Sequence, residues 1–537
     1  MFGIPTEVIA KITITETTDT VTLPVNPLTI AALSYTPRHL VARMNFKQES
    51  SNNSSHIQFN RDTGSNYNRQ HMQGSSSSAS GGRGNSGTGI HIGQGGSDAN
   101  QFLVNEILMP DALSTRSHKT TISLNNAAEA SVQVITGRWA NTAAITSVTM
   151  FTEGSGIHYS AGSTFELCVV DETFNLDQDG DGEQILTGTA SGIAVGSIGA
   201  ADGDLVVIGS IRGDRSARDT DSLELHFNSD TTAGNYYRQR LYGTGTTVAT
   251  SADNDDGFGK TTGASATASA FSAFLHVVPN YSDGSNDRTA LSLTGLHADS
   301  GQSDVYLEAR RWDNTAGITA FNLMPEVGSN FIAGSMLSTY VVPKGLIERQ
   351  ELSGTASSVA FTSIPQTYDH LELTAYIRDD RSATSDDILM SLTPVGGSSD
   401  TTDANYDRQL LQGSSTTVTA AQSAADRAIG NIPAASETAN VFGALTITLY
   451  NYTKTDRHKH SLSVSGRSAS ASGMYIRSNR WENTAAIEAI TLTPSAGTNF
   501  VAGTVVSLRG INSTVAAAAT DIETINGIAS SDIEAVN

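Results

Sequence analysis

The chain has 537 residues and a formal net charge of −22, although only 16% of its residues are charged. This length exceeds what one hydrophobic core usually supports, so about three domains are expected. The acidic net charge and the absence of a Lys/Arg cluster argue against binding to nucleic acid or to anionic membrane surfaces. No stretch is long and apolar enough to predict a membrane span.

The first residues, Met1 to Glu7, lack the basic start and apolar run of a secretory signal. We therefore expect the chain to fold in the reducing cytoplasm of the cell that makes it. Cys168 is the only cysteine, which excludes an intrachain disulfide and a cysteine-based zinc site. Its apolar surroundings, Phe165 to Val170, predict a small buried side chain rather than a reactive thiol.

Two phrases recur three times along the chain in the same order. Asn-Tyr-x-Arg-Gln is followed 73, 77 or 76 residues later by the tryptophan of Arg-Trp-x-Asn-Thr, and these are the only three tryptophans. Each asparagine is followed eight positions later by a glycine. Repetition on this scale marks a domain used three times. The phrases begin at Asn66, Asn235 and Asn405 and at Arg138, Arg311 and Arg480, and the glycines are Gly74, Gly243 and Gly413.

Each tryptophan is followed by alternating apolar residues, then a glycine-containing turn and a closing strand. Alternation is typical of a half-buried strand, and the glycines allow positive φ while an aromatic residue plugs the core edge. Many short strands and almost no helical periodicity predict an all-β protein of three tandem β-sandwiches, preferably jelly rolls. The predicted domains are 1–171, 184–343 and 344–511, with an acidic linker at 172–183 and a C-terminal tail at 512–537. Because the linkers are short, we expect a compact array.

Residues 74–99 are rich in serine and glycine and fall between shared landmarks of the first copy. This composition predicts an enlarged mobile loop, which either carries contacts or is a neutral insertion. The tail repeats Asp-Ile-Glu at 521 and 532. It is either an anchor that orders on a partner or a frayed end.

The linker contains Asp177, Asp179 and Asp181, spaced as in the first half of an EF-hand loop. The twelfth position is Gly188 where a bidentate glutamate would be needed. Calcium at these three aspartates is the one metal hypothesis, and an acidic turn without metal is the alternative. No other cofactor is expected.

Other candidate sites have simpler interpretations. His458 and His460 place two imidazoles on one face of a strand, but solvated strand-end residues are expected there rather than a metal site. The tryptophan phrase could bind sugar rings. Its presence in every copy instead favours a structural role, in which tryptophan closes one end of the sandwich, arginine stacks on it and asparagine or threonine fixes the next turn. No catalytic motif is present, so we expect no enzymatic activity.

The segments Phe59–Tyr67 and Phe361–Tyr368 and the Trp-x-Asn-Thr-x-x-Ile phrase resemble a module of virion structural proteins of tailed bacteriophages. The Ile-x-x-Ile-Asn-Gly-Ile-Ala tail is also similar to C-terminal segments of such proteins. The resemblance covers nearly the whole chain, once per copy. It departs in copy two, where Gly199 to Asp202 replace Pro-Gln-Thr-Tyr.

The resemblance implies a non-enzymatic virion component made in the host cytoplasm. We expect a capsid decoration, cement or head-fibre protein that binds other capsid or tail proteins. The alternative is a tail fibre or receptor-binding protein that recognises host surface glycan. Three fused copies imply either a pseudo-trimeric monomer on a locally threefold surface or a chain that itself forms a homo-oligomer.

Overall fold

The structure is a computed structural model that describes residues 4–50, 53–94, 100–127, 131–154, 156–176, 182–298, 302–343, 347–469 and 471–512. Each of the three copies forms an eight-stranded sheet and a four-stranded sheet. The prediction of three tandem β-sandwiches is therefore confirmed. No helix among the described residues has the length and apolar character needed to cross a membrane.

The first copy contains twelve strands and the short helix α1 (Pro27–Ala32). Its strands are β1 (Thr6–Thr13), β2 (Thr20–Pro24), β3 (Leu40–Phe46), β4 (Ser54–Phe59), β5 (Tyr67–Ser75), β6 (Ser78–Gly87), β7 (Ile90–Gln94), β8 (Leu103–Met109), β9 (Lys119–Ala127), β10 (Ser131–Trp139), β11 (Ser147–Thr152) and β12 (Thr164–Val170).

The linker begins with a 3₁₀ turn at Glu172–Phe174, and the second copy follows. Its strands are β13 (Glu183–Ile185), β14 (Ile193–Val195), β15 (Gly203–Ile211), β16 (Thr220–Phe227), β17 (Tyr236–Thr244), β18 (Thr247–Asp253), β19 (Gly257–Thr262), β20 (Ser272–Val278), β21 (Arg288–His297), β22 (Ser303–Trp312), β23 (Phe321–Pro325) and β24 (Met336–Pro343).

The third copy repeats the pattern and ends at Ile511. Its strands are β25 (Glu348–Glu351), β26 (Val359–Phe361), β27 (His370–Ile377), β28 (Ser385–Pro394), β29 (Tyr406–Ser414), β30 (Thr417–Ser423), β31 (Ala428–Pro433), β32 (Gly443–Tyr450), β33 (Lys459–Arg467), β34 (Gly473–Trp481), β35 (Ile487–Pro494) and β36 (Val505–Ile511). Further 3₁₀ turns lie at Ala233–Asn235 and Asp403–Asn405.

The strand order of each copy is that of a jelly roll with two added hairpins. In the first copy the sheets run β1-β12-β3-β8-β9-β10-β5-β6 and β2-β11-β4-β7. Without β5–β6 and β9–β10, the remaining strands form two facing sheets of four, β1-β12-β3-β8 and β2-β11-β4-β7, the arrangement of a double-sheet jelly roll. The other two copies have the same order.

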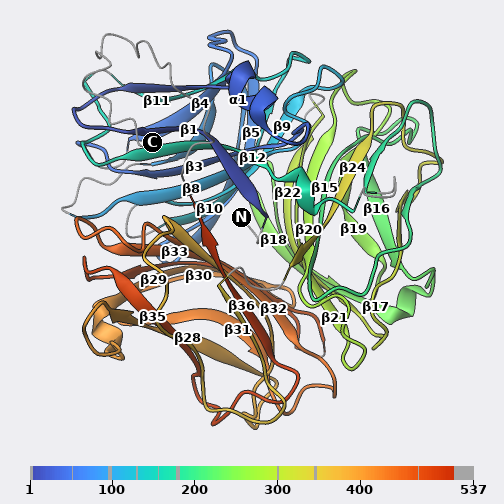
Figure 1. The fold of residues 1–537 in the computed structure, drawn as a ribbon. Coiled ribbons are helices and arrows are strands. Elements are labelled where there is room, and N and C mark those ends of the chain that lie inside the picture. Colours follow the sequence, from blue (N-terminus) through green and yellow to red (C-terminus); the bar gives the residue numbers. More distant parts are fainter. Residues whose placement is uncertain are drawn as a thin grey trace.

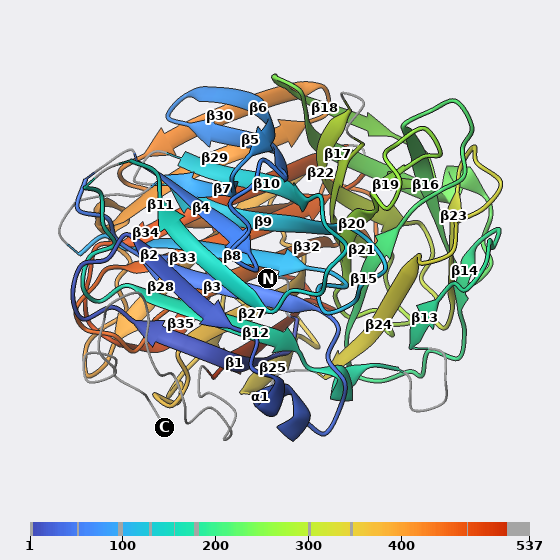
Figure 2. The same cartoon turned by 90° about the horizontal axis from the view of Figure 1, so that it is seen from above.

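The prediction of a mobile loop at residues 74–99 is wrong for most of that segment. Residues 78–87 form β6, which pairs with β5 at the edge of the large sheet, and residues 90–94 form β7 in the small sheet. Residues 95–99 lie outside the described residues. The same hairpin recurs as β17–β18 and β29–β30. Figure 2 shows the three hairpins gathered at one end of the molecule, where β6, β18 and β30 contact one another.

The three sandwiches surround a common axis, and Figure 1 looks down it onto three lobes coloured blue to cyan, green to yellow and orange to red. Each sandwich has its own core between its two sheets. The outer faces of the three large sheets form a further core at the centre, to which Met72, Leu241 and Leu411 contribute from equivalent positions. Because side chains alternate along a strand, β5 directs Tyr67 into its own sandwich and Met72 to the axis.

Candidate functional site

The tryptophan phrase is part of a partly exposed hydrogen-bond cluster that is the same in all three copies. Each indole N–H donates to an aspartate carboxylate, and the asparagine of Asn-Tyr-x-Arg-Gln donates to the same carboxylate. The tyrosine hydroxyl donates to the carbonyl of that aspartate. The indole bonds are Trp139 to Asp62 (2.7 Å), Trp312 to Asp230 (2.9 Å) and Trp481 to Asp400 (2.9 Å).

The asparagine after each tryptophan accepts a backbone N–H two residues further on, as the structural interpretation predicts. The predicted stacking of arginine on tryptophan is wrong. Neighbouring residues of a strand point to opposite faces, so the arginine faces the axis side while the tryptophan enters the sandwich. Arg138 donates to the carbonyl of His297 at 3.1 Å, and Arg311 to that of Ser468 at 2.7 Å. These two arginines therefore join neighbouring copies.

The glutamine of Asn-Tyr-x-Arg-Gln forms a ring of bonds around the axis. Each side-chain amide donates to a backbone carbonyl in the hairpin turn of the next copy, so the ring closes from copy one to two, two to three and three to one. The bonds are Gln70 to Gly245 (2.9 Å), Gln239 to Ser415 (3.3 Å) and Gln409 to Ser76 (3.1 Å).

The glycine eight positions after each asparagine allows the copies to approach at the axis. A Cβ on Gly74 would lie 2.9 Å from the Cβ of Leu411, and one on Gly243 would lie 3.1 Å from the Cβ of Met72. A Cβ on Gly413 would lie 3.3 Å from the Cβ of Leu241. The repeated glycine thus meets the repeated central core residue of a neighbouring copy.

A second ring of bonds involves the segments that lead into β9, β21 and β33. His458 directly precedes β33, and His460 lies in it. The backbone N–H before β9, β21 or β33 donates to a carbonyl of the neighbouring copy: His118 to Ser269 (2.9 Å), Asp287 to Asn440 (3.1 Å) and His458 to Asn100 (2.9 Å). His460 is buried and bonds to Asn126 of copy one. The expectation of solvated strand-end residues is therefore wrong for His460, because a neighbouring sandwich covers that strand end. Burial, with nearby cations, lowers the pKa of His460 to about 3.

A third ring uses a different pair of side chains at each interface. His39, Asp204 and His370 occupy equivalent positions at the N-terminal ends of β3, β15 and β27, and each accepts one backbone N–H within its own copy. Each also reaches the last strand of the next copy. These contacts are His39 to Ser338 (3.0 Å), Asp204 with Arg509 (2.8 Å) and His370 to Glu166 (3.2 Å).

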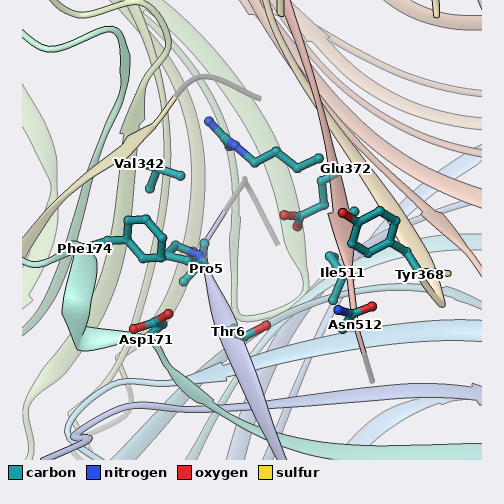
Figure 3. Close-up of a pocket in the computed structure, with 12 residues that line it drawn as sticks. Pro5, Thr6, Asp171, Phe174, Val342, Tyr368, Glu372, Ile511 and Asn512 are labelled. Atoms are coloured by element: carbon teal, nitrogen blue, oxygen red, sulfur yellow. The ribbon is translucent and has the colours of Figure 1, made fainter. Parts of the chain in front are cut away.

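At one end of the axis the three copies line a pocket of about 410 Å³. Figure 3 shows Pro5 and Thr6 of the first copy between Phe174 and Val342 on one side and Tyr368 and Ile511 on the other. Asp171, Glu372 and Arg509 add charge to a mostly apolar wall. The volume is in the range of small-ligand pockets. This pocket was not anticipated, because its walls come from chain segments up to five hundred residues apart.

The proposed calcium ligands Asp177, Asp179 and Asp181 lie outside the described residues, as do residues 513–537 of the tail. Cys168 is fully buried, as predicted, and burial raises the pKa of its thiol to about 12.

Sequence reasoning missed a group of metal-ligand type in copy two, which consists of Glu224, His226 and Asp256. The Glu-x-His spacing places two of these side chains on one face of a strand. That signal occurs in one copy only and names no third ligand.

Comparison with family models and with curated proteins finds no match. Among solved structures, the CBM40 module of a Ruminococcus gnavus sialidase, bound to sialyllactose, is similar at 13% identity over 30% of this chain and 92% of its own, with a TM-score of 0.14. Domains LG4-5 of the mouse laminin α1 chain show 10% identity over 61% of this chain and 89% of their own length, with a TM-score of 0.13. A GH43 protein of Bacillus licheniformis shows 9% identity over 76% of this chain and 84% of its own length, with a TM-score of 0.15. These scores carry no argument about fold or function.

Proposed function

We propose that the chain is a non-enzymatic structural protein of a tailed-bacteriophage virion, attached to the head as a decoration, cement or head-fibre protein. The observation that supports this is the closed ring of three jelly rolls, in which one chain supplies a three-lobed body. Such a body matches a locally threefold position of a protein shell without assembling from separate subunits.

The repeated motifs also support a structural role. The tryptophan, tyrosine and asparagine of each copy all bond to one aspartate of the same copy. The glutamine of each copy bonds to the next copy, and so do Arg138 and Arg311. The hydrogen-bonding groups of these side chains are therefore occupied within the fold and in the contacts between lobes. Binding specificity toward virion proteins is then carried by the outer surfaces, where the copies differ.

The test is a rebinding experiment with purified full-length chain. Particles stripped of the chain, or produced without it, are titrated with labelled protein alongside intact host cells. Saturable binding to the particles, at an occupancy equal to the number of local threefold positions, is the expected result. Particles already carrying the chain are the matched control and should take up none.

The competing proposal is a tail fibre or receptor-binding protein that recognises host surface glycan. It predicts binding to cells that soluble glycan blocks, with no saturable binding to stripped heads. That outcome would overturn the head assignment. Occupancy that follows twofold or fivefold positions would overturn the threefold argument.

A further inference from the structure

The outer face of copy two carries one imidazole and two carboxylates at the edge of the small sheet. Glu224 and His226 alternate along β16 with the core residues Leu223 and Leu225, so both point away from the sandwich core. Asp256 immediately precedes β19, the edge strand that pairs with β16. Pairing of these strands brings the three side chains together.

The ligand atoms are close to the spacing that a metal requires. His226 Nε2 lies 2.7 Å from Asp256 Oδ2 and 4.0 Å from Glu224 Oε2, and all three ligand atoms lie within 4.8 Å of one another. A tetrahedral site with bonds of about 2.0–2.2 Å separates its ligand atoms by roughly 3.4 Å. Side-chain rotations that move these atoms by on the order of 1 Å would therefore complete it.

The site is partly open to solvent, which leaves an entry path. The side chain of His226 is only 6% exposed, whereas those of Asp256 and Glu224 are 14% and 24% exposed. A bound cation would relieve the repulsion between the carboxylates, and solvent could supply the remaining ligand.

The equivalent places in the other copies hold different chemistry. In copy three Arg427 precedes β31 where Asp256 precedes β19, and its guanidinium donates to Ser391 and Asp403. In copy one Gln58 takes the place of His226 and donates to the carbonyl of Thr88 at 2.6 Å. Copy three thus places an arginine, and copy two a carboxylate, directly before the edge strand of the small sheet.

We propose that Glu224, His226 and Asp256 form a binding site for one divalent transition cation, such as Zn²⁺ or Mn²⁺. One imidazole with two carboxylates suits these borderline ions, whereas Ca²⁺ prefers oxygen ligands alone. The site lies on the outer edge of one lobe and away from the axis, so it does not depend on the proposed virion role.

The experiment titrates Zn²⁺ into metal-free, tag-free full-length protein and measures heat of binding and the shift in melting temperature. One site per chain is expected. His226→Gln, which installs the residue that copy one carries at this place, should weaken binding at least tenfold. Glu224→Gln leaves the bond between His226 and Asp256 in place and should also weaken binding at least tenfold.

The matched control is His56→Gln, which removes a half-buried histidine of copy one on the equivalent strand. This variant should bind Zn²⁺ as the wild type does. The proposal is overturned if wild-type protein binds no Zn²⁺ at 100 µM, or if both variants in copy two retain full affinity. Loss of binding in His56→Gln alone would also overturn it, because the ion would then belong to copy one.

Discussion

Replacing Asp379 by asparagine should stabilise the protein at neutral pH. Asp379 and Asp386 are 0% and 1% exposed, and their carboxyl groups lie beside each other in copy three. Burial and the adjacent Asp386 raise the pKa of Asp379 to about 8. Burial opposes ionisation of Asp386 as well, but Asp379 and two backbone N–H groups hold its pKa below the usual range. The pair therefore shares one proton at pH 7.

The free-energy cost of keeping Asp379 protonated in the folded state sets the expected change in stability. Because the folded pKa of Asp379 is raised, its contribution to stability is complete below pH 3.8 and is lost as the pH rises toward 8. At about 1.4 kcal/mol per pH unit, the loss at pH 7 is roughly 4 kcal/mol. Asparagine can donate to Asp386 and takes up no proton on folding. The variant should therefore gain about 2–4 kcal/mol at pH 7.

Urea unfolding of wild type and Asp379→Asn at pH 5, 6, 7 and 8 measures the free energy of unfolding of each protein. The difference between the two free energies should grow with pH. Copy two supplies the control, because Gly213 stands at the place of Asp379 and Asp221 at that of Asp386. Asp221 accepts the N–H of Gly328 at 2.7 Å, so Asp221→Asn should destabilise by about 1–3 kcal/mol. The shared-proton argument is refuted if Asp379→Asn is less stable at pH 7, or if its difference from wild type does not change with pH.

Three further predictions concern the ring and the repeated motif. Gly74→Ala should destabilise by about 1–3 kcal/mol in urea unfolding because its Cβ would overlap copy three, whereas Gly199→Ala, with nothing within 4 Å, should not. Burial lowers the pKa of His39 to about 3, so stability should fall as the pH drops below 6.5. His39→Gln should reduce the fall in melting temperature between pH 6.5 and 4.5, and an unchanged fall would contradict this. Trp312→Phe, which leaves a carboxylate without its indole donor, should cost about 1–3 kcal/mol in thermal unfolding, and no cost would contradict the structural role.

Much of the fold could be predicted because it depends on local patterns that occur three times. Alternating apolar residues after each tryptophan are strands, and the turn glycines Gly162, Gly334 and Gly503 have φ of +86°, +89° and +86°, as the turn requires. The sequence does not predict strand β6, because its residues are mostly small and exposed and show no apolar alternation. Its order comes from backbone pairing with β5 and from contact with β18 and β30, which no local pattern encodes.

The sites were harder to predict because they depend on distant partners. The repeated glycine and glutamine were recognised as landmarks, but the atoms that explain them belong to other copies. The group around His226 depends on the irregular register between β16 and β19, where Ser222 pairs with Lys260 and Glu224 with Gly257. A two-residue spacing in the sequence cannot reveal a third ligand brought in by a bulge.

The unequal chemistry at the three interfaces has an evolutionary consequence. In a homotrimer every substitution appears three times, so one interface cannot change without the other two. Here a neutral histidine–serine contact, an aspartate–arginine ion pair and a histidine–glutamate contact occupy the same position around one axis. Fusion into one chain lets each lobe mutate separately while the outline stays threefold. A threefold-symmetric body of this kind can therefore have three lobes that differ from one another in sequence.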